Sequence, residues 1–144
     1  MPDSRIFIDT NVLCYLLSEN TEKADRAERI VEKGGLISVQ VLNELANVAL
    51  KKLAMTWEEI NEVLDLLKAL CPVESLTLET HDMGRRVAQR YMLSVYDSMI
   101  VASALLAGCE ILYSEDMQNG LLVDGQLCIH NPFDPGCPLT GHSL

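Results

Sequence analysis

Short apolar, β-branched runs alternate along this chain with longer segments of helical periodicity, and this alternation constrains the fold more than any other feature. The runs are apolar at nearly every position, which is typical of strands buried on both faces. We expect strands at residues 5–9, 36–37, 73–78, 111–114 and 127–129. Because strands separated by helices favour a mainly parallel sheet with right-handed crossovers, the sequence predicts an α/β protein with helices on both faces of the sheet.

The expected helices are defined by their apolar stripes and by capping residues. The stripe over residues 22–33 ends at Gly34-Gly35, as a helix C-cap would, and Ser38 precedes the stripe over 42–53. Thr56 to Glu59 has the form of a capping box for a helix that continues to residue 70, and a further helix is expected over 79–92. Residues 96–107 are apolar on nearly every side, which predicts a helix enclosed by protein.

With 144 residues, of which 49% are hydrophobic and 22% are charged, the chain suits a single folded domain. We place this domain at residues 1–130 and expect 131–144, which contain several Pro and Gly residues, to form an irregular tail. We expect no membrane-spanning segment and no signal peptide, and the five cysteines include no C-x-x-C pair. These features favour a cytoplasmic protein with reduced thiols.

The net charge of −10 is opposite to that of a protein that coats nucleic acid, so any contact with nucleic acid must be local. It raises two possibilities, a cationic partner or a carboxylate cluster that holds metal ions. Four acids fall where this architecture brings chain segments together: Asp9 after the first strand, Glu44 on the helix after the second, Asp97 in the first turn of the enclosed helix, and Asp116 after the fourth strand. Because clustered carboxylates raise one another's pKa and a divalent cation compensates them, we expect a Mg²⁺ or Mn²⁺ site.

Each of these acids also has a purely structural interpretation. Asp97 could be a helix N-cap, Asp116 a turn residue, and Asp9 a cap for the segment that follows it. Glu44 is harder to explain in this way, because Val41 and Val48 place it at the apolar margin of its helix. The set of four is therefore a stronger indication of a site than any one member.

Four motifs, in this order and spacing, resemble the PIN domain family of metal-dependent ribonucleases, and in particular its toxins of VapC type. They are residues 7–13 (FIDTNVL), Ser38 with Asn43-Glu44, residues 96–102 (YDSMIVA) and residues 112–116 (LYSED). The resemblance implies a three-layer αβα sandwich around a mainly parallel sheet of four to five strands. It implies catalytic carboxylates at Asp9, Glu44, Asp97 and Asp116, of which Asp9, Asp97 and Asp116 bind the metal, with support from Asn11, Ser38 and Ser114.

The activity implied by the resemblance is hydrolysis of RNA phosphodiester bonds assisted by Mg²⁺ or Mn²⁺, with Glu44 either binding metal or orienting the attacking water. Basic residues that could contact RNA are Lys51, Lys52, Arg85, Arg86 and Arg90, although a solvated helix surface explains them equally well. The family further implies a small antitoxin partner and a homodimer, which exposed Trp57 and Tyr91 would permit. Residues 117–120 (MQNG) replace the basic and aromatic stretch of many members.

Other classes fit less well. Receiver domains and aspartyl-phosphate phosphatases need a lysine on a late strand, but the last lysine is Lys68. The glycines form neither G-x-G-x-x-G nor a P-loop. Cys128 and His130 would share a strand face, but no elbow or oxyanion signal surrounds them. The remaining alternative is a PIN-like RNA-processing or RNA- or protein-binding module with little or no turnover.

Overall fold

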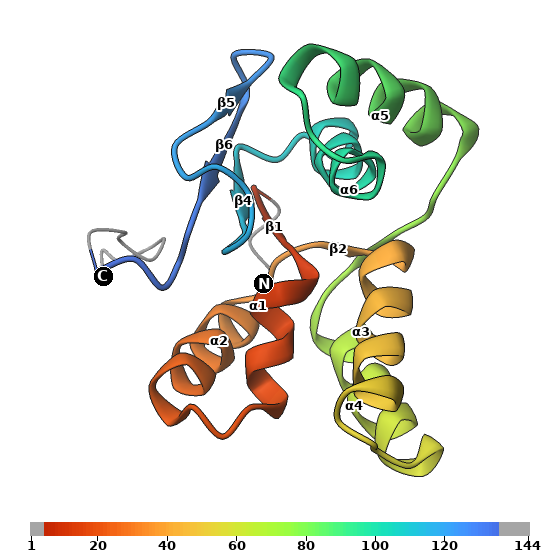
Figure 1. Ribbon diagram of the computed structural model, residues 1–144, viewed down its shortest axis with the longest axis vertical. Coiled ribbons are helices and arrows are strands. Elements are labelled where there is room, and N and C mark those ends of the chain that lie inside the picture. Colours follow the sequence, from red (N-terminus) through yellow and green to blue (C-terminus); the bar gives the residue numbers. More distant parts are fainter. Residues whose placement is uncertain (1–4, 136–144) are drawn as a thin grey trace.

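The computed structural model describes residues 5–135, in which helices surround a central sheet (Figure 1). In chain order the elements are β1 (Ile6–Ile8), α1 (Thr10–Cys14), the 3₁₀ turn η1 (Tyr15–Leu17), α2 (Thr21–Lys33), β2 (Ile37–Ser38), α3 (Val39–Lys51), α4 (Trp57–Leu70), β3 (Val73–Glu74), α5 (Leu78–Tyr91), α6 (Val95–Leu106), β4 (Ile111–Tyr113), β5 (Leu122–Val123) and β6 (Leu127–His130).

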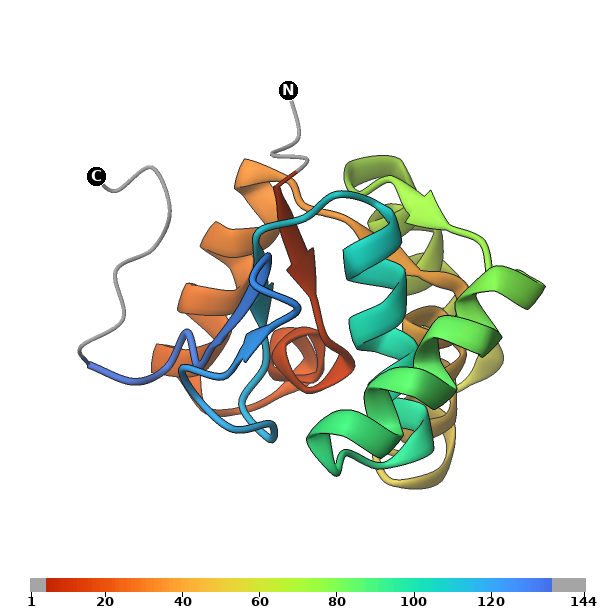
Figure 2. The same ribbon diagram turned by 90° about the horizontal axis from the view of Figure 1, so that it is seen from above.

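The sheet is mainly parallel, which confirms the expected fold class. Its strand order is β1-β4-β6-β5, with β1, β4 and β6 parallel and β5 antiparallel to β6. A separate parallel pair, β2 and β3, is linked to β1 through a bridge between Phe7 and Leu36. Seen from above, α2 covers one face of the main sheet, and α6, backed by α5, covers the other (Figure 2). The result is the three-layer αβα arrangement.

The core lies between these layers and is built from the apolar runs that predict the strands. Phe7, Ile8, Leu112 and Ile129 are completely buried. Helix α6 is buried over most of its length, as its apolar composition predicts. The predicted capping box at Thr56 is present, and Gly34 ends α2 with a positive φ of 82°.

Three segments differ from expectation. The strand predicted over residues 73–78 ends at Glu74. The Thr77 side chain accepts a hydrogen bond from Thr80 N and caps α5, which begins at Leu78, so the last residues of the predicted strand belong to the start of a helix. Strand β5 is not among the expected strands, since two residues carry no periodicity, and Asp124 turns the chain into β6 with a positive φ of 54°. The short helix α1 is likewise not among the expected helices, and Asp9 caps it.

Residues 131–135 follow β6 without forming a helix or strand, and the rest of the expected tail, with Cys137, lies outside the described residues. The Phe133 ring packs edge-on against Tyr15, with 4.8 Å between ring centroids. The four cysteines within the described part of the chain carry free thiols. Within residues 5–135, the helices are too short or too polar to cross a membrane.

Candidate functional site

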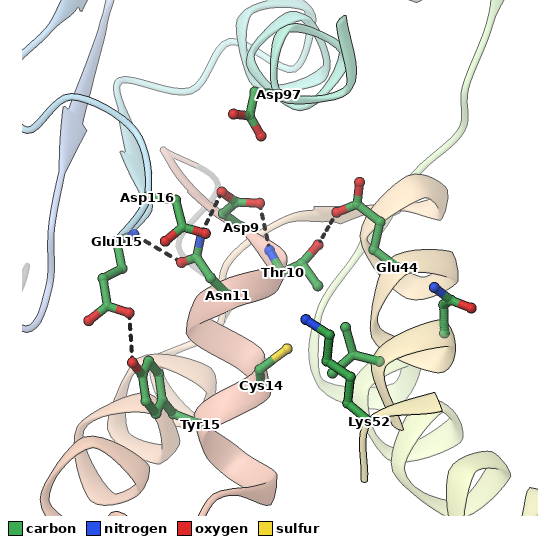
Figure 3. Close-up of a pocket in the computed structure, with 12 residues that line it drawn as sticks. Asp9, Thr10, Asn11, Cys14, Tyr15, Glu44, Lys52, Asp97, Glu115 and Asp116 are labelled. Atoms are coloured by element: carbon green, nitrogen blue, oxygen red, sulfur yellow. Dashed lines mark hydrogen bonds between the residues drawn. The ribbon is translucent and has the colours of Figure 1, made fainter. Parts of the chain in front are cut away.

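A cavity of about 500 Å³ opens beyond the carboxyl ends of β1 and β4. It is lined by Asp9, Thr10, Asn11, Cys14, Tyr15, Glu44, Asn47, Val48, Lys52, Asp97, Glu115 and Asp116. All four predicted acids therefore face one space, although Asp9 and Asp116 lie near opposite ends of the chain. Figure 3 shows the carboxylates of Asp97 and Glu44 directed from α6 and α3 toward the segment that bears Asp9.

Asp9 is the most tightly held of these acids. It is only 3% exposed, and its Oδ1 accepts a hydrogen bond from Thr10 N at 2.7 Å. Its Oδ2 accepts from Ser114 Oγ at 2.8 Å and from Asn11 Nδ2 at 3.0 Å. Burial raises the pKa of Asp9 to about 7, against the lowering effect of the Ser114 and Thr10 donors, and the charges of Asp97 and Glu44 raise it further. The ionised carboxylate is thus fixed in position but disfavoured electrostatically.

Asn11 and Ser114 join the start of α1 to the loop after β4. Asn11 Oδ1 accepts from Glu115 N at 2.9 Å, while Ser114 Oγ accepts from Met117 N at 3.3 Å. These contacts fix the backbone on both sides of Asp116, an exposed residue in a bend of the chain. The loop therefore depends on the same polar side chains that hold Asp9.

Glu44 is held by two residues that sequence reasoning missed. Its Oε1 accepts from Thr10 Oγ1 at 2.6 Å, and its Oε2 accepts from Gln40 Nε2 at 3.1 Å. Thr10 belongs to the Asp-Thr-Asn motif, which could have identified it, but Gln40 carries no comparable signal. Ser38 accepts a hydrogen bond from Val41 N and starts α3, and it is not among the residues that line the cavity.

Asp97 lies in the first turn of α6, but the interpretation of Asp97 as the N-cap is wrong. The N-cap is Ser94, whose hydroxyl accepts from Asp97 N at 3.1 Å, so the Asp97 carboxylate is not needed as a cap. Burial is the main cause that raises the pKa of Asp97, with further contributions from the charges of Glu44 and Asp116. The side chain thus faces the cavity and shares its negative potential.

The donor chemistry fits Mg²⁺ or Mn²⁺, because four carboxylates supply the hard oxygen ligands that these ions prefer. Burial raises the pKa values of Asp9 and Asp97, neighbouring carboxylates raise them further, and a bound cation would favour the ionised forms of both. Within residues 5–135, no group of three or more His, Cys, Asp or Glu side chains is close enough to form a ready-made metal cage. The acids surround an open space without converging on one point.

The basic residues proposed to contact RNA are distributed unequally. Of the described lysines and arginines, Lys52 alone lines the cavity, while Lys51 lies outside the lining. Arg85, Arg86 and Arg90 lie on α5, away from the lining as well. There Arg86 forms an ion pair with Asp124, and Arg85 with Asp82.

Tyr91 does not form the exposed apolar surface expected of it. It is half-buried, its hydroxyl donates to Asp124 Oδ1 at 3.1 Å, and the same hydroxyl accepts from Asp124 N at 2.8 Å. Trp57, in contrast, is 57% exposed on α4. Tyr91 therefore fastens α5 to the β5–β6 turn.

Comparison with known proteins assigns this chain to a family. The PIN domain family is matched over residues 6–118, whereas no curated protein sequence matches the chain. A toxin-antitoxin complex from Klebsiella pneumoniae is 20% identical, with a TM-score of 0.69 and coverage of 89% of this chain and 98% of that chain. A DNA-bound VapBC from Salmonella typhimurium is 19% identical, with a TM-score of 0.64 and coverage of 90% and 98% respectively. The Mycobacterium tuberculosis toxin VapC20, described as cleaving the sarcin-ricin loop, is 18% identical, with a TM-score of 0.61 and coverage of 77% and 89%. These likenesses show a shared fold, and because the family match spans most of the sequence, the chain belongs to the PIN domain family.

Proposed function

We propose that this PIN domain is a Mg²⁺- or Mn²⁺-dependent endoribonuclease that acts in the cytoplasm as the toxin of a type II toxin-antitoxin pair. The observation that carries the proposal is the single cavity that Asp9, Glu44, Asp97 and Asp116 all line, with Asp9 buried and held by three donors. Asp9, Asp97 and Asp116 would hold the metal. When bound, the metal polarises the phosphate and lowers the pKa of a water molecule.

The chain's own residues have separate tasks in this proposal. Asn11 and Ser114 keep the Asp9 carboxylate oriented, a supporting contact that commonly governs metal affinity. Thr10 and Gln40 orient Glu44, so that its carboxylate can accept a hydrogen bond from the attacking water.

Two further side chains of the lining fit a hydrolytic reaction. Lys52 lies across the cavity from Asp97, where its amine can contact an RNA phosphate (Figure 3). Burial, with nearby carboxylates, raises the pKa of the Cys14 thiol to about 11. This thiol therefore stays protonated near neutral pH and is not suited to act as a nucleophile.

The proposed partner is a small antitoxin protein, and we also propose a homodimer. Solved structures that share the fold include toxin-antitoxin complexes. The net charge of −10 favours a cationic partner, for which the acidic cavity offers a site for a basic side chain. Free thiols in the described part of the chain agree with a reducing compartment.

A second candidate is a PIN-like module that processes or binds RNA or protein with little or no turnover. The observation that favours it is the open arrangement of the carboxylates, which do not converge within the described residues. The two candidates differ in whether the cavity binds metal and supports cleavage.

Manganese calorimetry and cleavage of total cellular RNA, followed in the same samples, separate the two candidates. The variants are Asp97→Asn and, as a matched control, Asp25→Asn, which changes an exposed aspartate on α2. We expect wild type and Asp25→Asn to bind Mn²⁺ and cut RNA, and folded Asp97→Asn to do neither. Wild type that binds no metal at millimolar concentration and leaves RNA intact would refute the nuclease proposal and favour the binding module.

A further inference from the structure

A second hollow, of about 440 Å³, adjoins the carboxylate cavity and shares Glu44 and Asn47 with it. Its other lining residues are Gln40, Asn43, Leu76 and Tyr96. A ligand that places its reacting group at the carboxylates can therefore extend into this hollow without leaving the surface.

Tyr96 is the aromatic residue among those that line this hollow. Tyr96 is 70% exposed although it directly precedes Asp97, and Leu76, which lines the same hollow, is 43% exposed. Gln40 Nε2 donates to the Tyr96 carbonyl at 2.8 Å and also to Glu44 Oε2 at 3.1 Å. Gln40 thus ties the backbone of Tyr96 to a carboxylate of the cavity, while the ring stays available for a ligand.

Much of the lining that α3 contributes is polar. Asn43 and Asn47 lie four residues apart on α3 and are both exposed, so their amides occupy the same helix face. Each amide offers a hydrogen-bond donor and an acceptor. The described lining includes no lysine or arginine and contains the acid Glu44, a composition that disfavours a phosphate in this position.

We propose that this hollow binds a nucleobase of the RNA substrate next to the phosphate that is cut. The base stacks on Tyr96 with Leu76 beside it, and the amides of Asn43 and Asn47 bond to its edge. Aromatic rings that stack unpaired bases and amides that read their edges are the usual means of recognising single-stranded RNA. The inference rests on the proposed nuclease function and adds a site that determines which nucleotide lies beside the cut.

The test compares wild type with Tyr96→Ala, Tyr96→Phe, Asn43→Ala and the control Val95→Ala, which shortens an exposed neighbour outside the hollow. Binding of labelled single-stranded homopolymer 12-mers is measured by fluorescence anisotropy with Ca²⁺ in place of Mn²⁺. Cut sites with Mn²⁺ are mapped by sequencing the product ends, and light scattering gives the oligomeric state.

We expect Tyr96→Ala to weaken RNA binding by about 5- to 150-fold, the range for loss of one stacked base. Tyr96→Phe should restore binding, Asn43→Ala should change the nucleotide preference at one position beside the cut, and Val95→Ala should match wild type. A role of Tyr96 in folding alone would instead change the melting temperature and leave the nucleotide preference intact.

The outcomes separate this inference from the function on which it rests. If wild type cuts RNA and the Tyr96 and Asn43 variants share its affinity and cut sites, the nucleobase site is refuted while the nuclease stands. If RNA binding depends on Tyr96 but nothing is cut, the base site stands and the nuclease fails. Wild type that binds no RNA overturns the inference. A Tyr96→Ala variant that changes only the oligomeric state overturns it in favour of a protein contact.

Discussion

Replacing Asp9 by asparagine should change how the stability of the metal-free protein depends on pH. Burial holds the pKa of Asp9 at about 7 in the folded protein, compared with an ordinary value of 3.8. The folded state therefore binds the proton more tightly than the unfolded chain does. Stability from this group is complete below pH 3.8 and is lost as the pH rises through 7. The amide of the Asp9→Asn variant cannot ionise, so the variant shows no such loss.

The size of the effect follows from the two pKa values. Their difference corresponds to about 4 kcal/mol in total, at about 1.4 kcal/mol per pH unit, and about 2 kcal/mol of this falls between pH 5.5 and 8. The amide also has a fixed penalty of about 1–3 kcal/mol, because its NH₂ group replaces one acceptor oxygen and meets either Thr10 N, which donates to Oδ1, or Asn11 Nδ2 and Ser114 Oγ, which donate to Oδ2. This penalty does not depend on pH, so it changes the difference in stability between wild type and Asp9→Asn by the same amount at every pH.

The assay is thermal unfolding followed by circular dichroism in a chelating buffer from pH 5.5 to 8, a range above the sequence pI of about 4.6 where the chain would precipitate. Relative to Asp9→Asn, the melting temperature of wild type should fall by about 6 °C across this range. The control Asp25→Asn should follow wild type. At pH 8, Mn²⁺ should stabilise wild type and not Asp9→Asn. Parallel curves for wild type and Asp9→Asn would refute the reasoning, since the Asp9 carboxyl would then titrate alike in the folded and unfolded states.

Three further changes test other parts of the structure. Lys23→Met removes an amine that lies 2.6 Å from Glu115 Oε2, and we expect a loss of about 1 kcal/mol in urea unfolding; a double-mutant cycle with Glu115→Gln that shows no coupling would contradict this. Gly84→Leu places a Cβ 2.5 Å from Met99 Sδ between α5 and α6, and overpacking should lower the free energy of unfolding by about 1–3 kcal/mol, so an unchanged melting temperature would contradict this close approach. Lys52→Gln should reduce the slope of log Kd against log salt by about 0.7 for single-stranded RNA, as expected for one lost phosphate contact, and an equal slope would exclude that contact.

The predictable part of the fold is the part whose signal is local. The strands β1 and β4 are continuous apolar runs, and the helices carry stripes and caps within their own sequence. The segment 73–78 is apolar enough to predict a strand, but the Thr77 side chain caps a helix, and this polar contact outweighs the pattern. Strand β5 has two residues and exists because β6 offers it an edge, which is a tertiary property.

The same division applies to the site. Its four acids are predictable because each lies on or just after an element that is itself predictable: Asp9 and Asp116 follow strands, and Glu44 and Asp97 lie on helices. Parallel topology brings the carboxyl ends of the strands to one edge. The contact of Thr10 with Glu44 spans 34 positions, and that of Lys23 with Glu115 spans 92. Such pairs arise from how layers pack, and no spacing rule in one sequence reveals them.

The charge of the cavity sets the order in which its ligands can act. The lining contains the carboxylates of Asp9, Glu44, Asp97 and Asp116, and among the described residues Lys52 is its one lysine or arginine. A phosphate that approaches the cavity therefore meets a net negative charge. Near a protein surface, two unit charges about 4 Å apart repel by about 4 kcal/mol, more than one lysine offsets against several carboxylates. On the proposed function, the divalent cation must therefore bind before the phosphate or together with it. The proposed base site at Tyr96 contacts an uncharged part of the RNA. It can therefore hold the substrate beside the cavity before the metal binds.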